Sequence, residues 1–202
     1  MITTVIFDLF GTLLKLSSDS KPYLTLARRG TRTDTRNALQ LSLVNDCSNL
    51  TDYANLIGLS PQKDIDDLKA GLIEDIKSAK LFDDTLPVLK TLREKGIKTA
   101  LISNLAMPYK QVIADNKLDK YFDFLIYSCD CGLAKPDPLI YQLALDTLNS
   151  KAKETVMIGD SFKSDFEGSA RIGIKSLLLV REKDMSPDLK SVVSLDAVLD
   201  LI

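Results

Sequence analysis

The chain contains five short, mostly apolar runs, each of which ends in polar or small residues. These runs occupy residues 4–9, 99–103, 124–128, 155–158 and 176–180. Apolar runs of this length are typical of parallel strands that helices cover on both faces. Helical patterns lie between them, and Pro87, Pro108 and Pro138 each stand where such a helix would begin. The alternation of strand and helix predicts an α/β fold with a doubly wound parallel sheet.

Residues 17–79 form a contrasting segment without a strand-like apolar run. Ser60 and Pro61 are expected to start a helix, because apolar side chains follow at three- and four-residue steps: Ile65, Leu68, Leu72 and Ile76. Shorter helices are expected at 39–44 and at 53–57, where Gly58 would end the second. We therefore predict a core domain of residues 1–16 and 80–202, with a small helical domain, residues 17–79, inserted after the first strand.

The composition excludes several classes of protein. The 202 residues include no histidine, which rules out Ser-His-Asp catalysis and His-ligated zinc within this chain. A formal net charge of −2 gives no electrostatic reason to expect nucleic acid as a partner. No apolar run approaches the roughly 20 residues that span a bilayer, so no membrane association is expected. The N-terminus lacks a signal-peptide pattern and three cysteines form no disulfide framework, so a cytoplasmic protein is expected.

Polar residues stand at or just past the ends of the apolar runs. They are Asp8 with Gly11 and Thr12, Ser103 and Asn104, Lys135 ahead of the Pro138 helix, and Asp160 with Asp165. In an open α/β sheet, ligands bind beyond the carboxyl ends of the strands, so these side chains should meet in space. Clustered carboxylates repel one another, and Mg²⁺ with substrate phosphate oxygens would relieve this repulsion. A lysine and a hydroxyl would hold the remaining phosphate oxygens.

These residues resemble the four motifs of the haloacid dehalogenase (HAD) superfamily. Residues 5–12, Val-Ile-Phe-Asp-Leu-Phe-Gly-Thr, are similar to motif I, and Ser103-Asn104 to motif II. Lys135-Pro136 resembles motif III, and Gly159-Asp160 with Asp165 resembles the acidic motif IV. The order and spacing agree over nearly the whole chain. The resemblance implies a HAD-like Rossmannoid core, with residues 17–79 as a short C1-type helical cap.

The resemblance also assigns roles to the strand-end residues. Asp8 would attack phosphorus and form an aspartyl phosphate, with Lys135 as the second catalytic residue. Mg²⁺ would be bound by Asp8, Asp160 and the backbone carbonyl of Phe10, with support from Asp165. The predicted substrate is a small phosphorylated metabolite, and the residues expected to bind it are Gly11, Thr12, Ser103, Asn104 and Lys135.

Phe10 departs from the phosphatase pattern. Phosphatases of this superfamily carry a second Asp two residues after the nucleophile, which protonates the leaving group and then activates water. Because phenylalanine does neither, esters with poor leaving groups should react slowly. The favoured hypothesis is a Mg²⁺-dependent phosphohydrolase for substrates with good leaving groups, such as acyl phosphates. The alternatives are a C–X hydrolase like the 2-haloacid dehalogenases, which have Tyr at this position, and a non-catalytic phosphate- or partner-binding protein.

Other charged and sulfur-containing clusters have simpler interpretations. The cluster Arg28, Arg29, Arg32 and Arg36 favours a solvated basic face over a substrate clamp. Cys129 and Cys131 alone are weak evidence for a metal site. Acidic residues are expected to cap or favour helix starts: Asp64, Asp66, Asp67, Asp83, Asp84 and Asp196. The sequence carries no signal for the oligomeric state.

Overall fold

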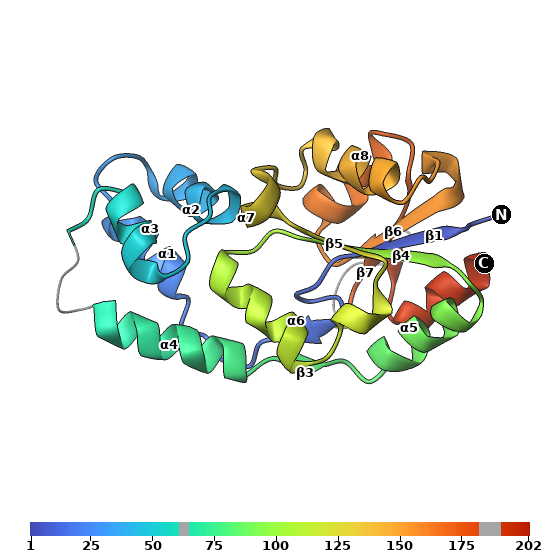
Figure 1. Cartoon of the computed structure of the whole chain (residues 1–202), viewed down its shortest axis with the longest axis horizontal. Coiled ribbons are helices and arrows are strands. Elements are labelled where there is room, and N and C mark those ends of the chain that lie inside the picture. Colours follow the sequence, from blue (N-terminus) through green and yellow to red (C-terminus); the bar gives the residue numbers. More distant parts are fainter. Residues whose placement is uncertain (61–64, 182–190) are drawn as a thin grey trace.

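The computed structural model describes residues 1–60, 65–181 and 191–202. Its centre is a parallel sheet with the strand order β5-β4-β1-β6-β7-β8 (Figure 1). The strands are β1 (Thr4–Phe7), β4 (Lys98–Ser103), β5 (Phe124–Tyr127), β6 (Thr155–Gly159), β7 (Lys175–Leu179) and β8 (Ser191–Val192). The predicted doubly wound sheet is confirmed. Each of the five apolar runs forms a strand, and the two-residue β8 at the edge was not predicted.

Strand β1 shows why its sequence is almost wholly apolar. Val5 lies opposite Thr99 on β4 and Val156 on β6, so β1 is paired along both edges. Successive side chains point to opposite faces: Val5 and Phe7 pack in one hydrophobic cluster and Ile6 in another. Since helices cover both faces, every residue of β1 is fully buried. Because β1 lies between β4 and β6, its carboxyl end is flanked by the ends of both of these strands.

Helices form a layer on each face of the sheet (Figure 1). One layer contains α5 (Thr85–Glu94), η1 (Met107–Lys110), α6 (Gln111–Asp115), η2 (Asp119–Tyr121) and η5 (Leu195–Leu201). The other contains α8 (Pro138–Thr147), with η3 (Ala152–Glu154) and the η4–α9 pair (Phe162–Glu167, Gly168–Ala170) beside it. The short α7 (Ser128–Cys131) follows β5. None of the described helices is long and apolar enough to cross a membrane.

The helix starts and caps predicted from proline and acidic residues were only partly correct. Pro138 opens α8 as predicted, with the Asp137 side chain accepting from the backbone of Leu139. Pro87, by contrast, is the third residue of α5, and Pro108 lies within a 3₁₀ turn ahead of α6. The Asp84 side chain does not cap α5, because it accepts hydrogen bonds from Arg181, Ser194 and Leu195. Asp196 does not cap the last helix either; the Ser194 hydroxyl does, by accepting from the backbone of Asp196.

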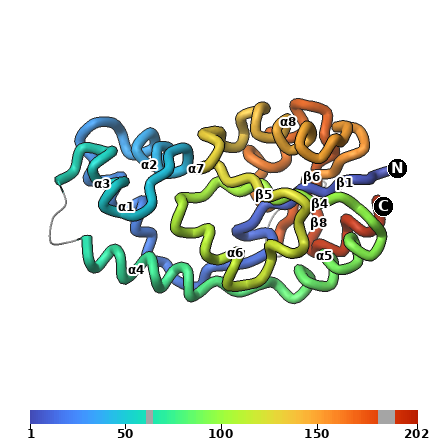
Figure 2. The backbone as a smooth tube through the Cα atoms, in the orientation of Figure 1, coloured from blue at the N-terminus to red at the C-terminus, as the bar shows by residue number. Residues whose placement is uncertain are grey.

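Four helices gather at one end of the molecule and are called the helical subdomain here: α1 (Pro22–Arg29), α2 (Thr35–Val44), α3 (Leu50–Leu56) and α4 (Ile65–Lys77) (Figure 2). They enclose their own hydrophobic cluster around Tyr23, Leu50 and Tyr53. The helix predicted from Ile65 onward is present as α4, whereas α1 was not predicted. The expected starting residue Pro61 and the acidic Asp64 lie outside the described residues.

A short antiparallel ribbon joins the two chain connections between the sheet and the helical subdomain. It pairs β2 (Leu14–Lys15) with β3 (Lys80–Leu81). Two residues per strand are too few to give an alternating sequence pattern, so the ribbon was not predicted. Its first strand follows the loop after β1 directly. The helical subdomain is therefore attached next to the carboxyl end of the central strand.

Candidate active site

Asp8 follows β1 and is held in place from two sides. Its side chain is buried and accepts a 2.6 Å hydrogen bond from Lys135 Nζ at Oδ1. The Thr12 hydroxyl donates to Oδ2 at 3.1 Å. The intervening turn contains Gly11 at φ +81°, where a Cβ would collide with the Asp160 carboxylate. Glycine thus permits both the left-handed turn and the close approach of a second acidic side chain.

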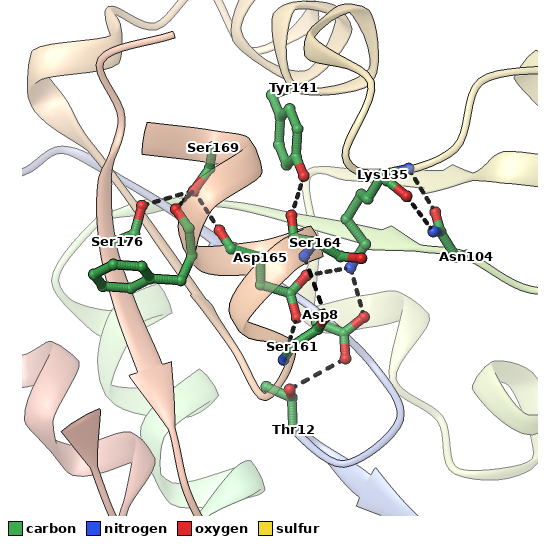
Figure 3. Close-up of polar contacts among 11 residues, drawn as sticks. Asp8, Thr12, Asn104, Lys135, Tyr141, Ser161, Ser164, Asp165, Ser169 and Ser176 are labelled. Carbon is green, nitrogen blue, oxygen red and sulfur yellow. Dashed lines mark hydrogen bonds and ion pairs between the residues drawn. The ribbon is translucent and has the colours of Figure 1, made fainter. Parts of the chain in front are cut away.

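Lys135 joins two carboxylates beneath the carboxyl edge of the sheet (Figure 3). Its ammonium lies 2.6 Å from Asp8 Oδ1 and 2.6 Å from Asp165 Oδ1, and its side chain is 2 % exposed. Asn104 holds the backbone of Lys135 with paired hydrogen bonds, each 2.8 Å long. The side chain of Asn104 is therefore engaged in positioning Lys135, a role that sequence reasoning did not assign to it.

The acidic pair after β6 completes the cluster. Asp165 is buried, and its second carboxylate oxygen accepts from the backbone of Ser161 at 3.0 Å. A Cβ at Gly159 would collide with Asp165, so the glycine makes room for this carboxylate. Asp160 remains exposed. Oxygens of Asp8, Asp160 and Asp165 all lie within 4.8 Å of one another, as sites for a divalent cation do.

The charges in this cluster are unbalanced, since three carboxylates surround one ammonium. Burial raises the pKa of Asp8 to about 6; Lys135 acts to lower it, and the carboxylates of Asp165 and Asp160 add to the rise. Burial and the Asp165 charge also raise the pKa of Asp160. For Lys135, burial acts to lower the pKa, but the two carboxylates outweigh it and the pKa is raised. The ammonium thus stays charged, and the site has capacity for a further positive charge.

A cavity of about 160 Å³ lies over the cluster, with the Ser103 side chain in its wall. Ser103 is 1 % exposed, and its hydroxyl has no hydrogen-bond partner among the described residues. Buried hydroxyls are normally paired, so this oxygen is suited to a polar ligand. Ser161 and Ser164 also line the cavity, and neither was predicted as a site residue.

The predicted residues differ in how directly they reach this cavity. Seven of them line it: Asp8, Phe10, Ser103, Asn104, Lys135, Asp160 and Asp165. Gly11 and Thr12 do not line it; they shape the loop and hold Asp8. The four arginines of the basic cluster are exposed and line no part of it. Burial raises the pKa of the Cys129 thiol to about 12, which disfavours its use as a metal ligand.

Phe10 forms the wall on the side of the helical subdomain. Its ring is half-buried and contacts Tyr109 edge to face, with ring centroids 5.8 Å apart. No acid occupies the position two residues after Asp8, as the sequence indicated.

An arginine outside the cavity supports the Asp8 loop. Arg181 follows β7, and its guanidinium donates to the backbone carbonyl of Thr12 at 2.5 Å and to Asp84 at 2.6 Å. Its position just past a predicted strand, at the same sheet edge as the other polar residues, is the signal that could have identified it.

The family model of haloacid dehalogenase-like hydrolases matches residues 2–173. The haloacid dehalogenase-like hydrolase domain-containing protein 3 of Bos taurus is 30 % identical over 105 residues, covering 52 % of this chain and 42 % of that protein. The chain thus spans about half the length of the vertebrate relatives it matches. The glyceraldehyde 3-phosphate phosphatase of Methanopyrus kandleri is 28 % identical over 213 residues, covering 93 % of this chain and 88 % of that protein.

Solved structures share the fold over almost the entire chain. A HAD phosphatase from Thermococcus onnurineus superposes with a TM-score of 0.69 at 21 % identity, covering 99 % of this chain and 97 % of that one. A dehalogenase superposes with a TM-score of 0.68, also at 21 % identity, covering 100 % and 97 %. At such identities the superpositions establish the fold, and the family match covers the Asp8, Lys135 and Asp165 cluster. The chain belongs to the haloacid dehalogenase-like hydrolases.

Proposed function

We propose that this protein is a Mg²⁺-dependent phosphohydrolase that acts on a small phosphorylated metabolite through an aspartyl phosphate at Asp8. The observation that carries the proposal is the unbalanced cluster around the cavity. Two carboxylates share one lysine, a third carboxylate lies beside them, and the buried Ser103 hydroxyl in the cavity wall lacks a partner among the described residues. A phosphate with a divalent cation supplies both the missing positive charge and the oxygen atoms for Ser103 and Lys135.

The residues present fit such a cation. Asp160 has an exposed carboxylate next to Asp8, and both would hold Mg²⁺ together with the Phe10 carbonyl. Asp165 uses both carboxylate oxygens within the protein, so its part would be to support the site and orient Lys135. Bound Mg²⁺ would offset the negative charge that the phosphate brings to three carboxylates.

The protein's own side chains then account for the transfer of the phosphoryl group to Asp8. Lys135 orients the Asp8 carboxylate and, with the Ser103 hydroxyl, holds oxygens of the phosphoryl group. A carboxylate oxygen of Asp8 forms a bond to phosphorus while the bond to the leaving oxygen breaks. Water then hydrolyses the aspartyl phosphate. Because Phe10 delivers no proton, the leaving oxygen must depart as an anion, which favours acyl phosphates and other substrates with good leaving groups.

One observation favours a second function, hydrolysis of a carbon–halogen bond. Phe10 places an aromatic ring where 2-haloacid dehalogenases are expected to have Tyr, and a halide departs without a proton. The Asp160 carboxylate argues against this alternative, since a reaction that needs no cation gains nothing from a third negative charge beside Asp8 and Asp165. A panel of 2-haloacids, assayed with EDTA, tests it directly.

The test of the main proposal is an assay on acetyl phosphate and a panel of phosphorylated metabolites, with Mg²⁺ and with EDTA. Turnover should require Mg²⁺ and disappear in Asp8→Asn. In Phe10→Asp, hydrolysis of alkyl phosphate esters should increase by about 10²–10⁴-fold, the range that a positioned acid contributes. The matched control is Phe10→Asn. Asparagine is similar in size to aspartate but is not an acid, so this variant should give no such gain. Phosphate binding without turnover on any substrate would instead support a non-catalytic binding protein.

A further inference from the structure

A second cavity, of about 230 Å³, lies between the helical subdomain and the sheet and is called the apolar cavity here. Its wall is largely made of leucine, alanine and aromatic side chains. The helices contribute Leu24, Leu39 and Leu43, and the segment after β4 contributes Leu105, Ala106 and Tyr109. Such concave, mostly apolar spaces with few polar groups are typical of small-molecule sites.

The apolar cavity adjoins the candidate active site. Phe10 and Asn104 line both this cavity and the one over Asp8. A compound whose phosphoryl group reaches Asp8 would therefore pass Phe10 and place the rest of its structure among the leucines. The Phe10 ring, braced edge to face by Tyr109, separates the reacting group from the body of the substrate.

Apart from the exposed Lys21 ammonium, which forms an ion pair with Asp19, the wall has little capacity for hydrogen bonds to a ligand. The Ser42 hydroxyl donates to the carbonyl of Leu39 at 2.7 Å, and the Tyr109 hydroxyl to Asp75 at 2.8 Å. Tyr23 has the one buried lining hydroxyl without a partner in the part of the chain that the structure describes. A polyol bound here would leave the hydroxyls that face this wall unpaired, which is costly. The wall therefore selects against sugar-like bodies.

Two leucines of the wall are not part of any hydrophobic cluster within the described residues. They are Leu24 and Leu43, and both are half-buried. Their apolar surface faces this cavity, where a ligand would cover it. An apolar cavity of about 150 Å³ is enough to hold benzene, so a volume of about 230 Å³ admits one ring with a small substituent.

We infer that the substrate is a small aromatic phosphate, an aryl or aroyl phosphate, with its ring in the apolar cavity. This inference rests on the proposed phosphohydrolase function and joins two separate observations. The cavity selects an apolar body, and Phe10 selects a leaving oxygen that departs without a proton, as phenolates and carboxylates do more readily than alkoxides. Asp8 forms a bond to phosphorus, and the P–O bond breaks with its electron pair on the aromatic product. Water then cleaves the aspartyl phosphate and releases inorganic phosphate, with its proton passing to solvent.

Benzoyl phosphate and acetyl phosphate form the matched pair that tests this inference. Both release a carboxylate as the leaving group, and only benzoyl phosphate carries a ring. With Mg²⁺, kcat/KM should be at least about tenfold higher for benzoyl phosphate, given the apolar surface of one ring. Leu43→Gln should reduce this ratio to about one to three. Leu41→Gln changes another half-buried leucine of α2 that does not line the cavity, so it should keep the wild-type ratio.

Binding of phenylphosphonate and methylphosphonate, measured by calorimetry with Mg²⁺ on the wild-type protein, provides a test that needs no turnover. Phenylphosphonate should bind at least about tenfold more tightly. Equal affinities, or binding of neither compound, overturn the inference whatever the kinetics show. Turnover of acetyl phosphate with no preference for benzoyl phosphate also overturns it while the proposed function stands. If neither acyl phosphate reacts, the proposed function fails, and the phosphonates alone decide whether the cavity binds aromatic phosphates.

Discussion

Two ion-pair networks, one buried and one part-buried, lie next to each other in this protein and differ in charge balance. The Lys135 network consists of Asp8, Lys135 and Asp165, and the Arg181 network of Arg181, Asp84 and Ser194. The Lys135 network holds two carboxylates against one ammonium, with the Asp160 carboxylate nearby, and faces a cavity. The Arg181 network pairs one guanidinium with one carboxylate, is partly exposed and does not line the cavity over Asp8. The guanidinium also lies 4.0 Å from the Phe82 ring centroid.

The difference in charge balance distinguishes two roles of ion pairs, ligand binding and stabilisation of the fold. An unpaired excess of one sign destabilises the folded state and is retained where a ligand relieves it. A balanced pair with several hydrogen bonds joins distant segments: Asp84 at the start of α5, Arg181 after β7 and Leu195 in η5. We therefore expect changes in the Lys135 network to affect turnover, and changes in the Arg181 network to affect stability.

The largest expected effects come from the same chemical change made in each network. Asp8→Asn should reduce turnover by at least about 10⁴-fold, the scale of losing a nucleophile. Without Mg²⁺ at pH 7.5 it should also raise the melting temperature, because one of three clustered carboxylates is removed. Asp84→Asn should lower the melting temperature and leave a folded enzyme with measurable turnover. If both variants shift the melting temperature in the same direction, the distinction between the networks is wrong.

Breaking the Arg181 network should produce the largest loss of stability. Arg181→Met removes the partner of a largely buried carboxylate, and we expect the free energy of unfolding to decrease by about 2–4 kcal/mol. Denaturant unfolding measures this loss, and a double-mutant cycle with Asp84→Asn should give a coupling energy above about 1 kcal/mol. A coupling near zero would show that the hydrogen bonds from Ser194 and Leu195 alone stabilise Asp84.

The sequence was sufficient for the parts of the fold that depend on local apolar runs. Residues 4–9 predicted the central strand because β1 is buried along its whole length. The ribbon of β2 and β3 and the edge strand β8 have two residues each, too few for a periodic pattern. Helix α1 begins at Pro22 and has Tyr23, Leu26 and Ala27 on its buried side. Because most of its other residues are polar, this pattern was not recognised in the sequence.

For the candidate site, the sequence predicted which residues meet but not how they are used. Asp8, Lys135 and Asp165 meet because strand ends share one edge of the sheet. Asn104 was predicted to bind substrate, yet its amide pairs with the backbone of Lys135, and side-chain orientation of this kind has no sequence signal. Asp84 was interpreted as a helix cap, the common local role, whereas its partner Arg181 lies 97 residues away.

The pH dependence of stability should also differ between the networks. The pKa of Asp8 is raised from 3.8 to about 6, so the folded state binds this proton more tightly than the unfolded state does. Its contribution is fully present below pH 3.8 and is lost as the pH rises through about 6, at a cost of about 1–3 kcal/mol. Asp160, whose pKa is also raised, acts in the same direction.

Asp84 should show the opposite slope. Burial acts to raise its pKa, but hydrogen bonds from Arg181, Leu195 and Ser194 outweigh this and hold the pKa below 3.8. Its contribution is present above pH 3.8 and is lost below it. Urea unfolding from pH 4 to 7 without Mg²⁺ should therefore show declining stability in the wild type and a flatter profile in Asp8→Asn. A wild-type profile that rises over this range contradicts the assigned sign.

The smallest expected effect concerns Thr12, the residue that touches both networks. Its hydroxyl donates to Asp8, while its backbone carbonyl accepts from Arg181. Thr12→Val removes only the first bond, so the free energy of unfolding should fall by about 0.5–1.5 kcal/mol and turnover by a few-fold, and Thr12→Ser should restore most of both. Since the bond to Arg181 uses the backbone, Thr12→Val and Arg181→Met should be additive within about 0.5 kcal/mol. Strong coupling would instead mean that the position of the Asp8 loop depends on Arg181, and that the two networks work as one.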